Sequence, residues 1–336
     1  APVVLFRTYA DLLAAAPGSL KGKIAVVTPR MVRSQDGGGY GAANLIRRAG
    51  PSEAARRGAV AYLLRSLGTD NHRLAHAGAL NYADGAPRIP AAALSNPDAD
   101  QLERLTALSP VRLRLVLTPT EHDAKSWNVV GEIKGRERPD EIVLIGGHLD
   151  SWDLGTGAID DGAGVAITVG AAKVIADLPR RPRRTIRVVM WGAEEMDYSG
   201  QAYAAAHASE APHIVVAGES DLGADRAYAV RLPASAVGGD FARALSDVLA
   251  PVGAYIDRLP ALYSGSDTHG LQQLGVPVVS IRQDGTNYFD IHHTADDTLD
   301  KVDPQALRQN VAAWAAFAYL AAETGIDFRA PAPAAQ

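Results

Sequence analysis

Cysteine is absent from the 336-residue sequence. The chain therefore forms no disulfide bond, offers no thiolate to a metal ion and has no cysteine nucleophile. This absence is compatible with the cytoplasm and equally with the periplasm or the extracellular space. Because the sequence begins Ala1-Pro2, without Met and without a basic and then apolar leader, we interpret it as a processed product. We accordingly expect a secreted or periplasmic protein from which a signal peptide has been removed.

Long apolar runs and an excess of positive charge are also lacking. No apolar run approaches the roughly 18 residues that a membrane-spanning helix requires. The 33 Lys and Arg residues are outnumbered by 38 Asp and Glu residues, and the formal net charge of −5 argues against a nucleic-acid-binding surface. The hydrophobic content of 47% is that of a globular protein. We expect neither a membrane nor a nucleic acid as a partner.

The apolar pattern of the first 120 residues predicts a small α/β domain, followed by a polar linker at 119–125. We expect strands at 3–6, 24–28, 58–64, 89–94 and 111–117, and helices at 9–16, at 51–57, where Pro51 marks the start, and at 98–108. The domain boundary is placed at residue 120, and residues 331–336 are expected to form a disordered tail.

Residues 121–330 predict a second, larger α/β domain. Its Val- and Ile-rich runs are nearly continuous, which is typical of strands buried on both faces of a parallel sheet. We therefore expect a mostly parallel mixed sheet with helices on both faces. The expected strands lie at 128–133, 142–145, 186–190, 214–217 and 276–281, and the expected helices at 164–176, 198–208, 240–249 and from Asp303-Pro304 onward.

Residues that can bind metal ions follow four of these strands. In a parallel α/β sheet, ligands bind beyond the carboxyl ends of the strands. We therefore expect these imidazoles and carboxylates to gather at one edge of the sheet. They are His148 with Asp150 after strand 142–145, Glu194-Glu195 after 186–190, Asp221 after 214–217, and His292-His293 after 276–281 and a loop.

These residue types fit a catalytic zinc site, because zinc binds His nitrogen and carboxylate oxygen and leaves a position for water. His148 would bind one metal ion, and Asp150 would hold its imidazole ring. Asp160 lies in a Gly-rich turn before a helix and could bridge two ions. Asp221 and His293 would complete the two coordination spheres.

Two adjacent pairs leave a choice. The side chains of Glu194 and Glu195 diverge, so that one can bind metal while the other takes a proton from water. A Glu-Glu pair is ordinarily a charge pair at a helix N-terminus, and it gains weight here from the other metal-competent residues. His292 and His293 compete for one ligand position, and we favour His293, which directly precedes residues 294–298.

The motifs resemble those of the M28 family of zinc peptidases, and most of all the plasma glutamate carboxypeptidase branch of that family. The segments that carry the resemblance are 147–153, 157–162, 191–195, 219–221 and 292–298, and it extends over most of residues 1–325. Residues 20–118 resemble the protease-associated insert that this branch carries beside its catalytic domain. Family members usually have a longer N-terminal segment before this insert than the sequence has.

The resemblance implies two zinc ions per chain and a role for each site residue. The implied ligands are His148, Asp160 and Asp221 on one ion and Asp160, Glu195 and His293 on the other, with Glu194 as general base and acid. Tyr263 lies where some relatives place a tyrosine that polarises the scissile carbonyl. Relatives often read Ser-Asp-His just after it, whereas Ser266-Asp267-Thr268 stands here.

We accordingly expect a dinuclear zinc exopeptidase of the aminopeptidase, dipeptidase or carboxypeptidase class. It would hydrolyse dipeptides or short peptides with a free N-terminus, using a hydroxide held between the metal ions and Glu194 as the proton carrier. We also expect a homodimer. Two alternatives remain, namely acyl transfer on a single zinc of the glutaminyl-cyclase type and a non-catalytic, peptidase-like binding module.

Overall fold

The computed structural model describes residues 1–331, and the chain divides into two units. The first unit comprises Ala1–Ala124, Trp152–Gly155 and Thr286–Asp296, and the second comprises Lys125–Ser151, Thr156–Gly285 and the chain from Asp297 onward. Residues 332–336 lie outside the described part, and with them all but the first residue of the expected disordered tail. Among the described helices, none is both long and apolar enough to span a membrane.

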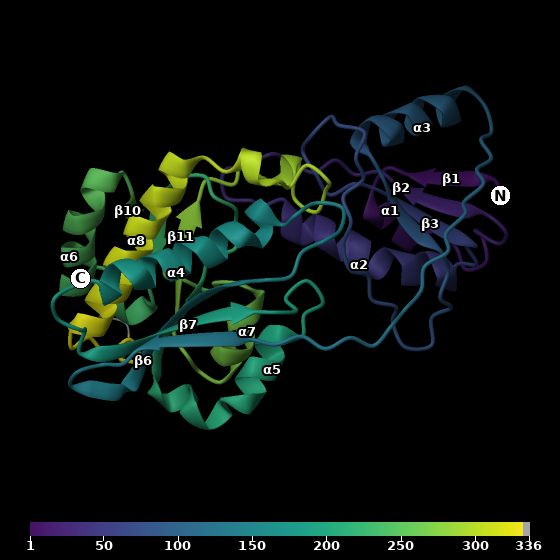
Figure 1. Cartoon of the computed structure of the whole chain (residues 1–336). Helices are drawn as coiled ribbons and strands as arrows, with labels where there is room; N and C mark the ends of the chain where they lie inside the picture. The colour runs from purple at the N-terminus through teal and green to yellow at the C-terminus, as the bar shows by residue number, and fades with distance from the viewer. Residues whose placement is uncertain (332–336) are drawn as a thin grey trace. The chain divides into compact units, whose positions relative to one another are not determined.

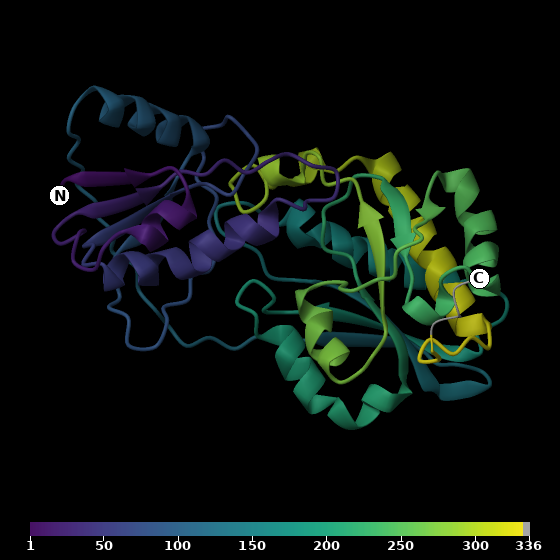
Figure 2. The ribbon, with the colours of Figure 1, turned by 180° about the vertical axis from the view of Figure 1, so that it is seen from behind.

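Four parallel strands form the sheet of the first unit, in the order β1-β2-β3-β4 (Figure 1). Successive residues of β2 alternate between two buried clusters: Ala25 and Val27 pack with α1 and α2, whereas Ile24 and Val26 pack with Leu102 of α3. Figure 2 shows α2 and α3 on opposite sides of this sheet. The elements are β1 (Val3–Phe6), α1 (Tyr9–Ala14), β2 (Ile24–Val27), α2 (Tyr40–Arg56), β3 (Ala61–Arg65), β4 (Ala91–Leu94) and α3 (Asn96–Leu108).

Two sequence predictions for the first unit are wrong. Helix α2 begins at Tyr40 and not at Pro51, which is buried inside the helix although an interior proline costs about 3 kcal/mol. Tertiary packing selects the helix here, and Gly50 lies so close to Tyr62 that a Cβ atom would be 2.3 Å from its hydroxyl oxygen. The described residues 111–117 form no strand, and Arg112 makes an isolated bridge to Pro2.

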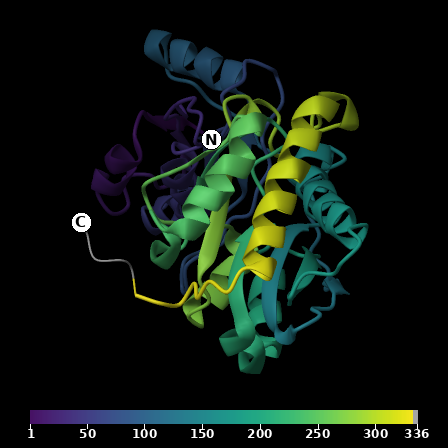
Figure 3. The ribbon, with the colours of Figure 1, turned by 90° about the vertical axis from the view of Figure 1, so that its left-hand side faces the viewer.

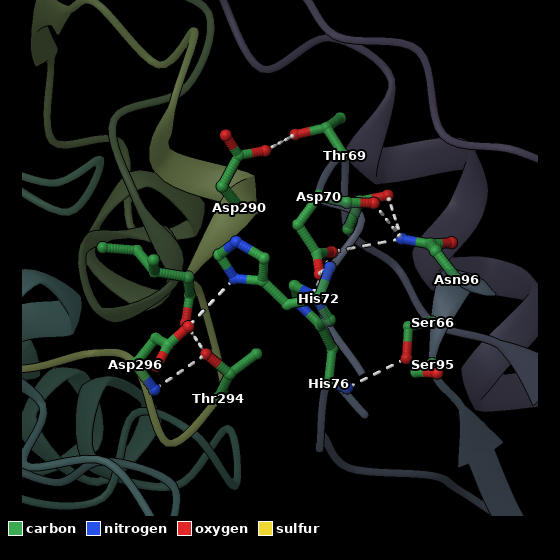
Figure 4. A network of polar contacts seen from close by, with 12 residues as sticks. Ser66, Thr69, Asp70, His72, His76, Ser95, Asn96, Asp290, Thr294 and Asp296 are labelled. Atoms are coloured by element: carbon green, nitrogen blue, oxygen red, sulfur yellow. Dashed lines mark hydrogen bonds and ion pairs between the residues drawn. The ribbon is translucent and has the colours of Figure 1, made fainter. Parts of the chain in front are cut away.

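A connection without helix or strand joins β3 to β4 and is held by polar side chains (Figure 4). Asp70 lies at its centre, with Oδ1 2.9 Å from Nε2 of His76 and 3.1 Å from Nδ2 of Asn96. Its Oδ2 accepts the main-chain N–H of His72 at 2.8 Å. We call these four residues the Asp70 network. Loops of this length are uncommon unless they have a function of their own.

The second unit is built on a seven-stranded sheet within the described residues, in the order β10-β9-β11-β8-β6-β7-β5. Strands β11, β8, β6 and β7 run parallel, while β5 is antiparallel to β7 and β9 is antiparallel to β11. The expected mostly parallel mixed sheet is confirmed. Its strands are β5 (Val129–Ile133), β6 (Arg138–His148), β7 (Arg184–Trp191), β8 (Ile214–Glu219), β9 (Ala227–Arg231), β10 (Tyr255–Ile256) and β11 (Val278–Gln283).

Helices cover both faces of this sheet, as expected. Val143 and Ile145 of β6 pack with α4, α6 and α8, whereas Ile142 and Leu144 of the same strand pack with α5 and α7. Figure 1 shows α4 and α8 on one side of β6 and β7 and α5 and α7 on the other, and Figure 3 shows α6 beside α8. The helices are α4 (Ala163–Ala176), α5 (Ser199–Ala206), α6 (Asp240–Leu249), α7 (Ser266–Gln273) and α8 (Pro304–Glu323).

Candidate metal centre

Three neighbouring parallel strands of the second unit carry metal-competent residues at their carboxyl ends. β6 ends at His148, and β7 and β8 end shortly before Glu194 and Asp221. Asp160 lies in the turn Ala158–Gly162, which leads directly into α4. The expected gathering at one edge of the sheet follows from the topology, since β8, β6 and β7 are neighbours in that order.

His148 is the centre of this group and is only 1% exposed. Its Nε2 lies 3.2 Å from Oδ1 of Asp160, 3.6 Å from Oδ1 of Asp221 and 3.8 Å from Oε2 of Glu194. This nitrogen makes no hydrogen bond with any of residues 1–331. Carboxylate oxygens from three separate segments therefore face one ring nitrogen, which is an arrangement that a metal ion can join.

The electrostatics of the group favour a cation. Burial, together with the negative charge of Asp221, raises the pKa of Glu194 to about 8. Burial by itself lowers the pKa of His148, but its contacts with Asp150, Asp160 and Asp221 raise it well above its ordinary value. The carboxylates thus gather more negative charge than one imidazolium neutralises. Imidazole nitrogen with carboxylate oxygen is the donor set that zinc binds, and these residues fit that ion.

Asp150 positions the loop that carries both glutamates. Its Oδ1 accepts the main-chain N–H of Glu194 at 2.9 Å, and its Oδ2 accepts that of Glu195 at 3.1 Å. Nδ1 of His148 lies 2.9 Å from the main-chain oxygen of Asp150 and 3.5 Å from its carboxylate. We predicted that the Asp150 side chain holds this imidazole, but the ring nitrogen is closer to the main-chain oxygen of Asp150. With Nδ1 engaged in this way, Nε2 is the nitrogen left to bind metal.

Two further carboxylates, neither of them a predicted metal ligand, also bind main-chain amides. Asp161 accepts the N–H of His148 at 2.9 Å, and Asp297 accepts the N–H of Asp160 at 3.1 Å. Asp161 follows Asp160 directly, and Asp297 lies in the motif 292–298, so that both were near a recognised signal. Sequence alone does not distinguish a carboxylate that accepts main-chain N–H groups from one that faces a metal ion.

Glu219 and Asp267 are buried carboxylates that the sequence analysis missed. Burial raises the pKa of Glu219 well above its usual range and that of Asp267 to about 7. Oε2 of Glu219 accepts the N–H of Thr268 at 3.0 Å. Carboxylate oxygens of Glu219, Glu194 and Asp221 lie within 4.8 Å of one another. The position of Glu219, two residues before Asp221, was the available signal.

Glu195 and Tyr263 are the remaining predicted site residues of the second unit. Glu195 offers an oxygen within 4.8 Å of the ligand atoms of His148 and Glu194. Tyr263 is half exposed, and its hydroxyl donates to Oγ of Ser266 at 3.3 Å. Tyr263 and Glu194 line the same cavity, of about 320 Å³. The structure therefore brings Tyr263 to the cavity of Glu194, and its catalytic role stays a prediction.

His292 and His293 lie in the segment Thr286–Asp296 of the first unit, and their rings stack with centroids 3.6 Å apart. Nδ1 of His293 lies 3.1 Å from the main-chain oxygen of Ala77. A carbonyl against Nδ1 is typical of metal-binding histidines, and His148 has the same arrangement. The ring of His292 instead packs against three aromatic residues, Tyr40, Tyr288 and Phe289. These surroundings favour His293 over His292 as the ligand.

An α/β sheet with an imidazole and carboxylates at its carboxyl edge is the arrangement of a metal-dependent hydrolase. Residues 128–318 match the model of peptidase family M28, and the chain belongs to this family. The resemblance inferred from the motifs is confirmed.

Among its relatives, Carboxypeptidase Q of Bos taurus is 34% identical over 330 residues, which cover 96% of this chain and 67% of that protein. The enzyme of the same name from Homo sapiens is 33% identical and covers 95% and 67%. A solved peptidase M28 precursor from Shewanella amazonensis SB2B is 43% identical with a TM-score of 0.90, covering 99% of this chain and 76% of that one. The zinc aminopeptidase BSAP of Bacillus subtilis, 20% identical with a TM-score of 0.60 over 96% and 75%, shares the fold. The expectation of an enzyme of the metallo-exopeptidase class agrees with these names.

Proposed function

We propose that the protein is a dinuclear zinc exopeptidase that hydrolyses dipeptides or short peptides with a free N-terminus. The convergence of three carboxylates on the buried Nε2 of His148 carries the proposal. Membership of family M28, with relatives named as carboxypeptidases and as a zinc aminopeptidase, supports the reaction class and the metal.

The ligands would be divided between two ions, with Asp160 shared. The residues that would hold them are His148, Asp160 and Asp221 for the first and Asp160, Glu195 and His293 for the second. Zinc bound there would polarise the scissile carbonyl and lower the pKa of a water molecule. The hydrogen bonds from main-chain amides to Asp150, Asp161 and Asp297 hold three of the ligand-bearing segments in place.

Glu194 would carry the proton of the reaction. Its carboxylate would take a proton from the attacking water while the new C–O bond forms. It would then give that proton to the nitrogen of the leaving amine as the C–N bond breaks. Tyr263 lines the same cavity and would donate a hydrogen bond to the carbonyl oxygen of the substrate.

The proposal also covers the nature of the first unit and the oligomeric state of the protein. The first unit would be a protease-associated insert, on the resemblance of residues 20–118 to that module. The protein would work as a homodimer in the periplasm or outside the cell. Sedimentation of the purified protein tests the dimer, because a monomer at working concentration would contradict it.

Metal content per chain, measured with hydrolysis of a dipeptide panel on the same sample, tests the proposal directly. Two zinc ions with cleavage of free dipeptides are expected. One zinc ion without cleavage would contradict the dinuclear site and indicate acyl transfer of the cyclase type. A protein that binds no zinc and cleaves nothing after zinc is restored would be a binding module.

A further inference from the structure

We infer that the cavity beside Glu194 receives a cationic side chain of the substrate, that of lysine or arginine. The inference rests on the proposed function, because it names the substrate class of that same site. It is carried by the residues that line the cavity, by a carboxylate oxygen of one of them that is buried without a hydrogen bond, and by the turn that follows Glu194.

The lining of the cavity is acidic. It lies between the loop after β7, the N-terminal part of α5 and the length of α7, and its volume is about 320 Å³. A cavity of roughly 150 Å³ already holds benzene, so this one has room for an extended basic side chain. Three carboxylates line it, those of Glu194, Asp197 and Asp267, and none of its lining residues is Lys or Arg. The other polar side chains of the lining are those of Gln201, Gln273, Tyr263, Ser266 and His269.

Asp267 offers the cavity an acceptor without a donor. The residue is 2% exposed, and its Oδ1 accepts the hydroxyl of Ser199 at 2.6 Å. Its Oδ2 is buried and makes no hydrogen bond with any of residues 1–331. A buried acceptor left in this state costs free energy, which an ammonium or guanidinium group entering the cavity would recover.

The N-terminus of α7 favours an anion in the cavity, but its effect is smaller than that of the carboxylates. The N-terminus of α7 carries a partial positive charge of roughly half an electron, which favours anions. Asp267 lies in the first turn of α7, and a cation in the cavity would favour the ionised form of its carboxylate. Glu194 and Asp197 then add to the negative potential of the cavity, and the balance favours a cation.

A tight turn places Asp197 at the cavity, where its carboxylate would favour a cationic side chain. Its φ of 59° is in the left-handed region, and its main-chain N–H donates to the oxygen of Glu194 at 2.6 Å. This turn brings the Asp197 carboxylate to the same cavity as Glu194. Two of the lining residues also bring α5 and α7 close together, because a Cβ atom on Gly200 of α5 would be 2.3 Å from the Cα of Asp267 of α7.

Two matched dipeptide series measure the selectivity of the zinc-loaded enzyme. Lys, norleucine and Glu are each placed before Ala and, in the second series, after Ala. In one of the two series, the kcat/KM of the Lys dipeptide is expected to exceed that of the norleucine dipeptide about tenfold, which is equivalent to about 1.4 kcal/mol. It is expected to exceed the kcat/KM of the Glu dipeptide about a hundredfold. Asp197→Lys should invert the order of Lys and Glu. Asp247→Asn, which removes an exposed charge on α6 of the opposite face, should keep the native ratio.

Binding separates this inference from the proposed function. Calorimetry with the zinc-loaded Glu194→Gln variant compares the dissociation constants of the Lys and norleucine dipeptides, which is a readout that needs no turnover. Several-fold tighter binding of the Lys dipeptide supports the inference even if native protein cleaves nothing, in which case the proposed function alone fails. Equal rates and equal binding for Lys, norleucine and Glu would overturn the inference. They would show that the cavity takes at most the N-terminal ammonium.

Discussion

Each unit buries a histidine against an aspartate, and each histidine has a buried ring nitrogen without a hydrogen bond in the described chain, Nδ1 of His76 and Nε2 of His148. The two histidines differ in the carboxylates around them. In the first unit, both carboxylate oxygens of Asp70 are engaged by donors from His76, His72 and Asn96 (Figure 4). In the second unit, His148 faces carboxylate oxygens of three residues through one nitrogen that makes no hydrogen bond within the described chain.

The difference lies in the balance of donors and acceptors. A buried polar network whose acceptors are satisfied by the protein stabilises a fold. A buried cluster with more acceptors and more negative charge than the protein can satisfy is completed by a cation. On this criterion the Asp70 network is structural, and the cluster at His148 is a metal centre.

The largest effect is expected from Glu194→Gln. The amide cannot take a proton from water, so kcat should fall about a thousandfold, equivalent to about 4 kcal/mol in activation free energy. Zinc content should stay at the native value, since Glu194 is not among the proposed ligands. Steady-state kinetics and metal analysis on one preparation check both points. Full activity in this variant, or loss of zinc, would contradict the assignment, and Asp247→Asn is the control for removal of a negative charge.

Alanine substitutions of His148 and His76 should have different effects on zinc binding and on stability. His148→Ala removes a proposed ligand, so zinc per chain should fall and activity should be lost. His76→Ala should leave zinc unchanged and lower the free energy of unfolding by about 2–4 kcal/mol, because it removes a buried hydrogen bond and leaves a cavity. Metal analysis and urea denaturation of both variants measure this. Zinc loss in His76→Ala would indicate a metal ion in the first unit and contradict a purely structural role for the Asp70 network.

Removal of zinc should destabilise native protein by a smaller amount. A ligand at a hundred times its dissociation constant stabilises the folded state by about 2.7 kcal/mol, so chelation should lower the unfolding temperature by several degrees. The shift should persist in His76→Ala and shrink in His148→Ala. Calorimetric scans with and without chelator test this, and equal shifts in the two variants would speak against a metal centre at His148.

The smallest effect concerns the pH dependence of the Asp70 network. Burial by itself raises the pKa of Asp70, but hydrogen bonds from His76, His72 and Asn96 hold it below its usual range. The ionised Asp70 carboxylate stabilises the fold fully above its pKa in the unfolded chain, which is about 3.9. This stabilisation is lost as the pH falls through the lower pKa of Asp70 in the folded protein. The difference in unfolding free energy between native protein and Asp70→Asn should therefore narrow below about pH 4. A constant difference down to pH 2.5 would refute this.

Buried strands were the most predictable part of the fold. The Val- and Ile-rich runs that became β6, β7, β8 and β11 were visible because continuous burial leaves a local pattern. The short β9 and β10 were missed, and so was α7, in which Leu271 is the one large apolar residue buried. The start of α2 was misplaced, since packing against Tyr62 keeps its chain helical through Pro51.

The sequence by itself determined which residues could bind metal, because residue type and position after a strand are local properties. His148, Glu194 and Asp221 were all recognised in this way. Only the tertiary structure decided which carboxylates face His148 and which, like Asp161, accept main-chain amides. It also decided that His293 belongs to the first unit and rests on Ala77. Such contacts join residues far apart in the chain, and their distances exist only once the strands have paired.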